Sequence, residues 1–306
     1  MLFRCDQNSK SGFGHFSRCL NLARHLSLFN SVDVTFLGDY SDFSKSFLSN
    51  YKIKYLEVSG LEFKNVHKDI IEKHSYILLD SYFITQGYLD KVCELDVKTI
   101  FIDDNCVLDF SGVDLVINFR LDVEKIFSYS SSHKALGLQY FIYKPEFLSL
   151  RKKATFKSKV KKILLFLGGL DLEESFYVEI VNLIREIDSK IKVLVISNKL
   201  DLAMENVVVL KPTFEIENYL ENIDVIINGG GLIKYEGVFC KIPSVTFSNT
   251  ELQYEDTLLL ESKKVVYNLG LIGDVFENKA FLKTKLKRFI NESELRKEIF
   301  KKSETL

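Results

Sequence analysis

The sequence predicts an α/β protein made of two Rossmann-like domains that face each other across a cleft. Short, continuous apolar runs alternate with helix-like segments along the chain, which is typical of parallel sheets covered by helices on both faces. Each half also has a strand that is followed closely by glycines and then by a helix. At 306 residues, the chain has the length of two domains of about 150 residues each.

Composition narrows the classes of function that we expect. With 41 basic and 42 acidic residues, the net charge of −1 argues against a dedicated nucleic-acid surface. No apolar run is long enough to span a bilayer, and the first residues resemble a core strand, so we expect a cytoplasmic protein without membrane insertion. The 5 cysteines include no C-x-x-C pair, and we expect no metal site, no cofactor and a monomer.

In the first half, further strands follow the short one that begins at Leu2. The last three of them end in polar residues, and ligands of such sheets bind outside the carboxyl ends of the strands. Because aspartate also favours turns and helix caps, we assign Asp103 and Asp104 to that role and leave Asp80 open. The predicted strands are Val32–Leu37, Tyr51–Val58, Tyr76–Leu79, Thr99–Ile102 and Leu115–Ile117.

The apolar periodicity weakens between about residues 128 and 159. This stretch contains a polar segment, an aromatic segment with Pro145, and a basic run over residues 151–159. We interpret it as the crossing between domains, and the basic run as a solvated linker. The predicted domains are residues 1–145 and 146–306.

The second half repeats the alternation of strands and helices. Its predicted strands are Lys161–Leu167, Lys192–Ile196, Val207–Leu210, Asp224–Ile227, Pro243–Phe247 and Lys264–Tyr267. Its predicted helices are Glu173–Ile187, Phe214–Leu220, Leu232–Cys240, Thr250–Ser262 and one or two basic helices over Glu277–Lys302. Two groups of glycines follow predicted strands in this half: Gly168-Gly169 comes directly after one, and Gly229-Gly230-Gly231 comes after Asn228 at the end of another.

The loop after the first strand is the best candidate site of the first domain. Gly12 and Gly14 allow a sharp turn or the close approach of a ligand. Apolar residues recur at helical spacing from His15 on, so His15 lies in a first helical turn, where unpaired N–H groups favour anions. A histidine there is well placed to act on a phosphorylated ligand. The motif is not the dinucleotide fingerprint, because Ser17 replaces its third glycine, and a lone histidine is often structural.

The stretch from Asn228 to Gly231 is the best anion candidate of the second domain. Consecutive glycines before a helix expose N–H groups without a Cβ in the way. Glu236, one turn further, could accept both hydroxyls of a ribose, and the amides of Asn249 and Gln253 could pair with a base or an acetamido sugar. The alternatives are that the glycines serve close packing, that Glu236 is a surface residue and that Asn249 caps a helix. Motifs of P-loop enzymes, zinc proteases and serine hydrolases are missing from the sequence.

Several motifs resemble those of one known family. Phe3-Arg4-x-Asp6, followed by Gly12-Phe13-Gly14-His15-x-x-Arg18, resembles the opening of the UDP-2,4-diacetamido-2,4,6-trideoxy-β-L-altropyranose hydrolases of pseudaminic acid biosynthesis. These enzymes are related to the lipid II-forming N-acetylglucosaminyltransferase and share its glycosyltransferase-B fold. The resemblance covers most of the chain, and its further motifs are Asp80-Ser81-Tyr82, Asp103-Asp104, Asn118, Gly137-x-x-Tyr140, Glu146-Phe147, Gly168-Gly169-Leu170-Asp171, Gly230-Gly231 through Glu236, and Asn249 with Gln253.

The resemblance implies a metal-independent hydrolase that releases UDP from a UDP-linked 2,4-diacetamido-2,4,6-trideoxy sugar. Water would attack the anomeric carbon, with C–O cleavage and inversion, in the first domain's histidine loop, while the second domain binds the nucleotide. His15 would be the general base or position the water, Tyr82 would hold the sugar or the water, and Asp6 belongs to the implied catalytic set. The implied substrate contacts are Gly12, Gly14, Arg18, Gly168, Gly169, Gly230, Gly231, Leu232, Glu236, Asn249 and Gln253.

Two alternatives stay open beside the hydrolase. In a glycosyltransferase of the same fold, His15 would activate an acceptor hydroxyl instead of water. A non-catalytic nucleotide-sugar-binding protein is the other, and the intact His15, Asp6 and Tyr82 argue against it. The chain also departs from the family pattern, because Leu170 replaces a threonine, Leu232-Ile233 replaces hydroxyl residues near the diphosphate, and Lys234 adds a charge.

Overall fold

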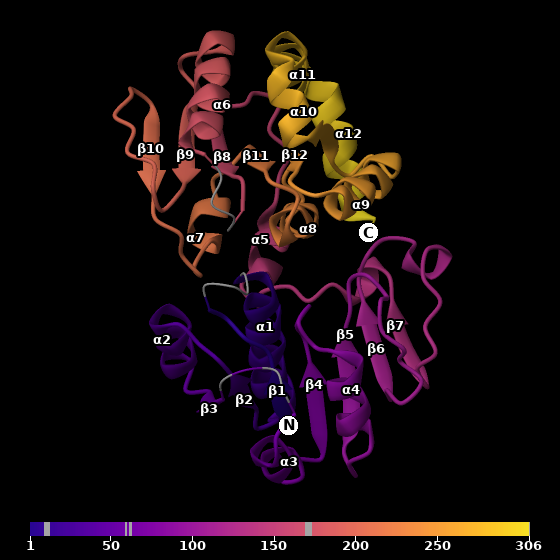
Figure 1. The fold of residues 1–306 in the computed structure, drawn as a ribbon. Coiled ribbons are helices and arrows are strands. Elements are labelled where there is room, and N and C mark those ends of the chain that lie inside the picture. The colour runs from indigo at the N-terminus through magenta and orange to yellow at the C-terminus, as the bar shows by residue number, and fades with distance from the viewer. Residues whose placement is uncertain (9–12, 59, 61–62, 169–172, 306) are drawn as a thin grey trace. The chain divides into compact units, whose positions relative to one another are not determined.

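The chain divides into two compact units, Met1–Pro145 and Glu146–Leu306 (Figure 1). The computed structural model describes all residues except 9–12, 59, 61–62, 169–172 and 306. Each unit contains a parallel sheet, flanking helices and an apolar core of its own.

In the described part of the first unit, seven strands form one sheet in the order β3-β2-β1-β4-β5-β6-β7, and neighbouring strands are parallel. The order reverses between β1 and β4, so the carboxyl ends of these two strands form the switch point of the sheet. The strands are β1 (Leu2–Arg4), β2 (Thr35–Gly38), β3 (Lys54–Glu57), β4 (Tyr76–Leu79), β5 (Lys98–Ile102), β6 (Leu115–Asn118) and β7 (His133–Leu136). The helices are α1 (Phe13–Asn30), α2 (Asp42–Asn50), α3 (Asn65–Ile71) and α4 (Gln86–Cys93), with 3₁₀ turns η1 (Val123–Lys125) and η2 (Leu138–Tyr140).

The central strands β1 and β4 are buried on both faces, which explains the apolar runs Leu2–Phe3 and Ile77–Leu79. Alternate residues of a strand point to opposite faces. Leu2 of β1 belongs to a core cluster that includes Leu89 of α4. On the other face, the ring of Phe36 lies 5.4 Å from that of Phe3 and 5.9 Å from that of Phe16 on α1, measured between centroids. This packing fixes α1 against the sheet and thereby fixes the position of its first turn.

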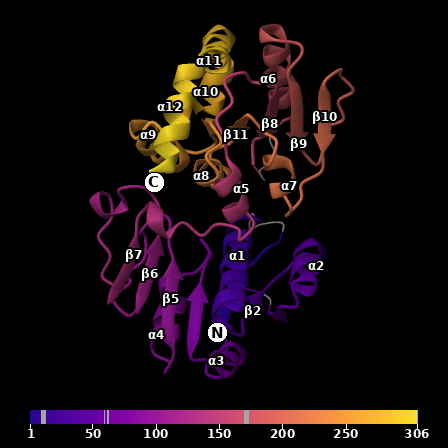
Figure 2. The same ribbon diagram turned by 180° about the vertical axis from the view of Figure 1, so that it is seen from behind.

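In the described part of the second unit, six strands form a parallel sheet in the order β10-β9-β8-β11-β12-β13, which reverses between β8 and β11. The strands are β8 (Lys162–Phe166), β9 (Lys192–Ile196), β10 (Val207–Leu210), β11 (Val225–Asn228), β12 (Ser244–Ser248) and β13 (Tyr267–Leu271). The helices are α5 (Phe147–Lys153), α6 (Glu174–Ile187), α7 (Glu217–Leu220), α8 (Leu232–Phe239), α9 (Glu251–Ser262), α10 (Ile272–Glu277), α11 (Lys279–Asn291) and α12 (Ser293–Glu304). Helices α10, α11 and α12 lie side by side, as both views show (Figures 1 and 2).

The predicted fold class of two parallel α/β sheets is confirmed. The bounds of β4, β9 and β10 coincide with the predicted strands Tyr76–Leu79, Lys192–Ile196 and Val207–Leu210. These strands have apolar runs whose ends are marked by polar or turn residues, so the sequence alone delimits them.

Several details differ from the prediction. The stretch interpreted as a polar crossing contains the edge strand β7, whose residues are exposed or half-buried because it pairs only with β6. Helix α10 was not predicted. The last strand begins at Tyr267 instead of Lys264, because Lys264 adopts a left-handed turn conformation with a φ of 60°.

Candidate functional site

His15 and Asp80 form a hydrogen-bonded pair at the switch point of the first sheet. His15 lies in the first turn of α1, and Asp80 directly follows β4. The His15 Nδ1 atom is 2.6 Å from Asp80 Oδ1; the His15 side chain is 12% exposed, and that of Asp80 is fully buried. Because an ionised carboxylate only accepts hydrogen bonds, Nδ1 carries the proton of a neutral imidazole, and Nε2 is left as a proton acceptor.

Arg18, one helical turn after His15, lies between two carboxylates. Its Nε and Nη2 atoms donate to Asp80 at 2.7 and 2.6 Å, and its Nη1 and Nη2 atoms donate to Asp104 at 2.8 and 3.0 Å. These charge-assisted contacts use the fork geometry of the guanidinium group, and Arg18 is buried. The sequence predicted Arg18 as a substrate contact, whereas the structure turns these donors toward the two aspartates.

The Asp80 carboxylate accepts hydrogen bonds on both oxygens. His15 and Arg18 donate to Oδ1, and Oδ2 accepts from Arg18 and from the Cys19 thiol, whose Sγ atom is 3.3 Å away. Burial by itself disfavours the charge, but Arg18 and His15 outweigh burial and lower the pKa of Asp80 to about 2. A fixed anion at this position orients the imidazole ring and stabilises the imidazolium that forms when the ring takes up a proton.

Tyr82 covers one side of the histidine ring. The two rings meet edge to face, with 4.3 Å between their centroids, although Tyr82 is 59% exposed. The Tyr82 hydroxyl donates to Asp104 Oδ2 at 2.8 Å. Burial of the hydroxyl and the Asp104 charge both raise the pKa of Tyr82, so the phenol stays a neutral donor. His15 and Tyr82 of the predicted catalytic set therefore lie together.

The two aspartates after β5 have different roles. Asp103 accepts from the backbone N–H groups of Asn105 and Cys106 at 3.1 and 2.7 Å and from the Tyr129 hydroxyl at 2.6 Å, which is the predicted turn role. For Asp104 the turn prediction was wrong, because its carboxylate pairs with Arg18 and Tyr82. No signal for this contact exists in the sequence, because it depends on which strands are neighbours in the sheet.

Asp6, the third member of the predicted catalytic set, has other contacts. Its Oδ1 atom is 2.6 Å from Arg4 Nη1 and accepts from the backbone N–H of Asp39 at 2.8 Å. The Arg4 guanidinium is buried and also donates to the carbonyl oxygens of Leu37 and Gly60. These contacts link the end of β1 to the end of β2. Of the predicted glycines of this loop, Gly14 is exposed in the first turn of α1 and Gly12 lies outside the described residues.

The glycines after β11 leave the start of α8 open. Gly231 is the N-cap residue of α8, and no side chain caps the free N–H groups there. A Cβ at Gly229 would lie 1.8 Å from the Leu167 carbonyl oxygen, and one at Gly230, where φ is 80°, would lie 2.8 Å from that of Phe247. A Cβ at Gly231 would meet no atom of the described residues within 4 Å. The first two glycines therefore serve close packing, and the third borders open space where an anion could approach the helix N-terminus.

Asn249 links the loop that follows β8 to the glycine loop that follows β11. Its Nδ2 atom donates to the carbonyl oxygens of Leu167 and Gly229 at 3.2 and 2.8 Å. Gln253 Oε1 accepts from the Asn249 backbone N–H at 3.0 Å, and the cap of α9 is Thr250. The structure thus gives Asn249 and Gln253 a scaffolding role at the carboxyl ends of β8, β11 and β12. Gly168 lies at this edge with a φ of 102°, and Gly169 is outside the described residues.

The first turns of α8 carry the other predicted contacts. Leu232 and Glu236 are both half-buried. Between them, the buried Lys234 places Nζ 2.6 Å from Asp256 Oδ2, which also accepts from the Tyr235 hydroxyl. This pair holds α8 against α9 and was not predicted, since the two residues are far apart in the sequence.

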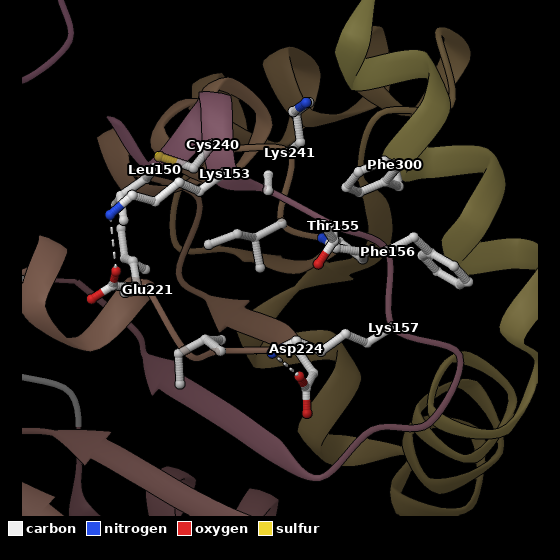
Figure 3. Close-up of a pocket in the computed structure, with 15 residues that line it drawn as sticks. Leu150, Lys153, Thr155, Phe156, Lys157, Glu221, Asp224, Cys240, Lys241 and Phe300 are labelled. Carbon is white, nitrogen blue, oxygen red and sulfur yellow. Dashed lines mark hydrogen bonds and ion pairs between the residues drawn. The ribbon is translucent and has the colours of Figure 1, made fainter. Parts of the chain in front are cut away.

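The cavity in Figure 3 lies at the opposite edge of the second sheet. Its lining includes Asp224, which precedes β11, and Pro243, which precedes β12. Its volume is about 80 Å³. Pockets that bind small molecules or cofactors usually have volumes of several hundred Å³. Its lysines are paired: Lys157 lies 2.9 Å from Asp224, and Lys153 lies 3.4 Å from Glu221 (Figure 3). The cavity is therefore not the candidate site.

The described residues include neither a membrane-spanning helix nor a cluster of metal ligands. No helix within them combines the length and the apolar character needed to cross a bilayer. Likewise, no three or more His, Cys, Asp or Glu side chains in the described residues are grouped to hold a metal ion.

One archaeal protein is similar to the chain in sequence. The uncharacterized protein MJ1062 of Methanocaldococcus jannaschii is 25% identical over 297 residues, which cover 84% of this chain and 58% of that protein. The chain thus spans little more than half the length of this relative. No protein-family profile matches the sequence.

Solved glycosyltransferase structures match nearly the whole chain. UGT89C1 of Arabidopsis thaliana, in complex with quercetin, has a TM-score of 0.71 at 12% identity and covers 99% of this chain and 92% of its own. MurG of Acinetobacter baumannii has a TM-score of 0.57 at 12% identity, with 100% and 99% covered. The spinosyn rhamnosyltransferase SpnG, in complex with thymidine diphosphate, has a TM-score of 0.69 at 9% identity, with 99% and 95% covered. Such identities speak for the fold and not for the activity. The two parallel sheets and these likenesses identify the fold of this chain as the glycosyltransferase-B fold.

Proposed function

We propose that this chain transfers a sugar from a nucleoside-diphosphate sugar to an acceptor hydroxyl, with His15 as the general base. The observation that carries the proposal is the contact between His15 Nδ1 and the ionised Asp80, because it leaves Nε2 as a proton acceptor at the ligand edge of the first sheet. Nε2 takes the proton of the acceptor hydroxyl, and the oxygen of that hydroxyl forms a bond to the anomeric carbon. The bond from that carbon to the diphosphate oxygen breaks, which inverts the configuration.

The second unit binds the nucleoside diphosphate in this proposal. The uncapped N-terminus of α8 and the open space beside Gly231 suit the diphosphate, and the helix dipole stabilises the charge that develops as it leaves. Glu236 is the proposed ribose contact, one turn further along α8. The glycosyltransferase-B fold supports a nucleotide sugar as donor, and we expect the nucleotide to be UDP.

Water as the acceptor is the second candidate. It is favoured by the motifs Gly12-Phe13-Gly14-His15-x-x-Arg18 and Asp80-Ser81-Tyr82, which resemble those of the hydrolases of pseudaminic acid biosynthesis. The same base serves both reactions, since Nε2 deprotonates water as it would an alcohol. The products are then UDP and a free 2,4-diacetamido-2,4,6-trideoxy sugar.

Release of the nucleoside diphosphate separates these readings. The purified protein is offered UDP-2,4-diacetamido-2,4,6-trideoxy-β-L-altropyranose and a panel of other UDP- and TDP-sugars, with EDTA, in the presence and absence of candidate acceptors. Release that requires an acceptor supports the transferase, and release without one supports the hydrolase. Tight binding of a nucleotide sugar without release would instead indicate a binding protein. If the protein neither binds any of these sugars nor releases a nucleoside diphosphate from them, the proposal is overturned.

A further inference from the structure

Asp104 is the residue from which we draw an additional role for the site, and the inference rests on the proposed function. We propose that Asp104 is a positioning residue that balances the charge of Arg18, so that His15 can take up a proton without leaving the cluster positively charged. Asp104 follows β5, whereas His15 and Arg18 lie on α1 and Asp80 follows β4. Three separate elements therefore contribute to one ionic cluster.

The geometry makes Arg18 a bridge between the two carboxylates. Arg18 uses one side of its guanidinium group for Asp80 and the other for Asp104, and its Nη2 atom also lies 3.1 Å from His15 Nδ1. The Arg18 and Asp104 side chains are only 4% and 15% exposed, so solvent screens their charges weakly. Burial disfavours the Asp104 charge, but the charge and the hydrogen bonds of Arg18 lower the pKa of Asp104, so the carboxylate stays ionised.

The balance of charge changes when His15 acts. With a neutral imidazole, the two aspartates and Arg18 together carry one net negative charge. When Nε2 accepts a proton, the cluster becomes neutral, which favours the imidazolium in a poorly solvated site. Without Asp104, the Arg18–Asp80 pair is already neutral, and the same proton would create a buried net positive charge.

Other groups that face the cluster do not replace this charge. Tyr82 donates its hydroxyl to Asp104, and Cys19 donates its thiol to Asp80; both are neutral donors. Arg120 donates to the Asp104 backbone carbonyl at 3.3 Å, and the carboxylate of Asp103 is engaged by Tyr129 and two backbone N–H groups. Asp104 is thus the carboxylate that meets the far side of Arg18.

The test measures the imidazole of His15 directly. Its titration is followed by NMR in the full chain without substrate, and turnover of the donor is measured in parallel. In Asp104→Asn, we expect the titration midpoint of His15 to fall by about one pH unit, and kcat to fall about 10- to 100-fold. KM for the donor should stay within about threefold, since the lost interaction belongs to the proton transfer. Asp42→Asn, which removes one exposed negative charge from the first turn of α2, is the control and should leave both values unchanged.

A second variant covers the case in which Asp104→Asn does not fold. The double variant Arg18→Met with Asp104→Asn removes one charge of each sign, so the net charge of −1 stays with Asp80, which keeps its contact with His15. Its cluster has the wild-type balance, so the His15 midpoint should lie within about half a pH unit of wild type. A midpoint that falls by a full unit or more in the double variant would overturn the charge-balance role.

The two proposals fail in different ways. If the wild type turns over a donor but Asp104→Asn keeps both the kcat and the His15 midpoint of wild type, Asp104 is only structural and the proposed function stands. If the wild type neither binds nor turns over a nucleotide sugar, the proposed function fails, while the NMR titrations still decide whether Asp104 stabilises the imidazolium.

Discussion

At the scale of single residues, the activity that we propose depends on one imidazole nitrogen. Asp80 fixes the proton of His15 on Nδ1, and the edge-to-face ring of Tyr82 restricts how the imidazole can turn. Both contacts come from residues just after β4, which is buried at the centre of the sheet. The orientation of the His15 ring is therefore set by residues at the buried centre of the first sheet.

Replacement of His15 tests the base. In His15→Ala, we expect kcat to fall roughly 100-fold or more, because proton transfer by a positioned base contributes about that much. Affinity for the nucleoside diphosphate, measured by calorimetry, should stay within a few-fold of wild type, since the proposed diphosphate site belongs to the second unit. His133→Ala on the exposed edge strand β7 serves as the matched control. Wild-type turnover in His15→Ala would contradict the assignment.

Asp80 should also leave a signature in acid. Because its pKa is lowered from 3.8 to about 2 in the folded chain, the ionised form stabilises the fold above about pH 4. That contribution, about 2 kcal/mol, is lost as the pH falls from about 4 toward 2. Urea unfolding at pH 5 and pH 2.5 measures it, and Asp80→Asn, although less stable throughout, should lose less stability between these pH values. An equal loss in both proteins would rule out the depressed pKa.

At the scale of elements, the start of α8 combines a tightly packed loop with an open helix N-terminus. The loop is rigid, because Gly229 and Gly230 pack against backbone carbonyls and Asn249 binds two further ones. It is also open, because Gly231 caps the helix without a side chain. A rigid loop with unused N–H groups binds an anion at little cost in conformational entropy.

Gly231→Ala probes this open space. The added methyl group meets no atom of the described residues within 4 Å, so the free energy of unfolding should change by less than about 1 kcal/mol. The methyl group would occupy the proposed site of the diphosphate, so we expect the Kd for UDP to rise about tenfold or more. Gly273→Ala in α10, where a Cβ is equally unhindered, is the control. Unchanged UDP affinity in Gly231→Ala would move the anion site elsewhere.

At the scale of the whole molecule, each unit has its own sheet and its own buried apolar cluster. Much of this could be predicted, because strands such as β4 and β9 are buried on both faces and therefore read as unbroken apolar runs. The edge strand β7 could not be predicted in this way. It pairs only with β6, so its residues are exposed or half-buried and form no apolar run. Contacts across the sequence, such as Arg18 to Asp104, were also out of reach, because they depend on the strand order.

Separate cores predict separate unfolding. We expect calorimetry to resolve two transitions, and UDP at 100 times its Kd to stabilise the one that belongs to the second unit by about 2.7 kcal/mol. Hydrogen exchange assigns each transition to its unit. A single transition, or a UDP effect confined to the first unit, would contradict this assignment of the nucleotide site.

The ending of β4 at Asp80 has a consequence for how such a protein could diversify. The base is anchored in the scaffold, whereas the connections that follow β5, β6 and β7 at the same edge carry exposed apolar side chains, Val107, Ile126 and Tyr140. Apart from Asp104, which contacts Arg18 and Tyr82, those connections can be exchanged without altering the contacts of His15. Under the proposed function, replacing these connections with those of a homologue would change which acceptor is used, while His15 and Asp80 stay unchanged.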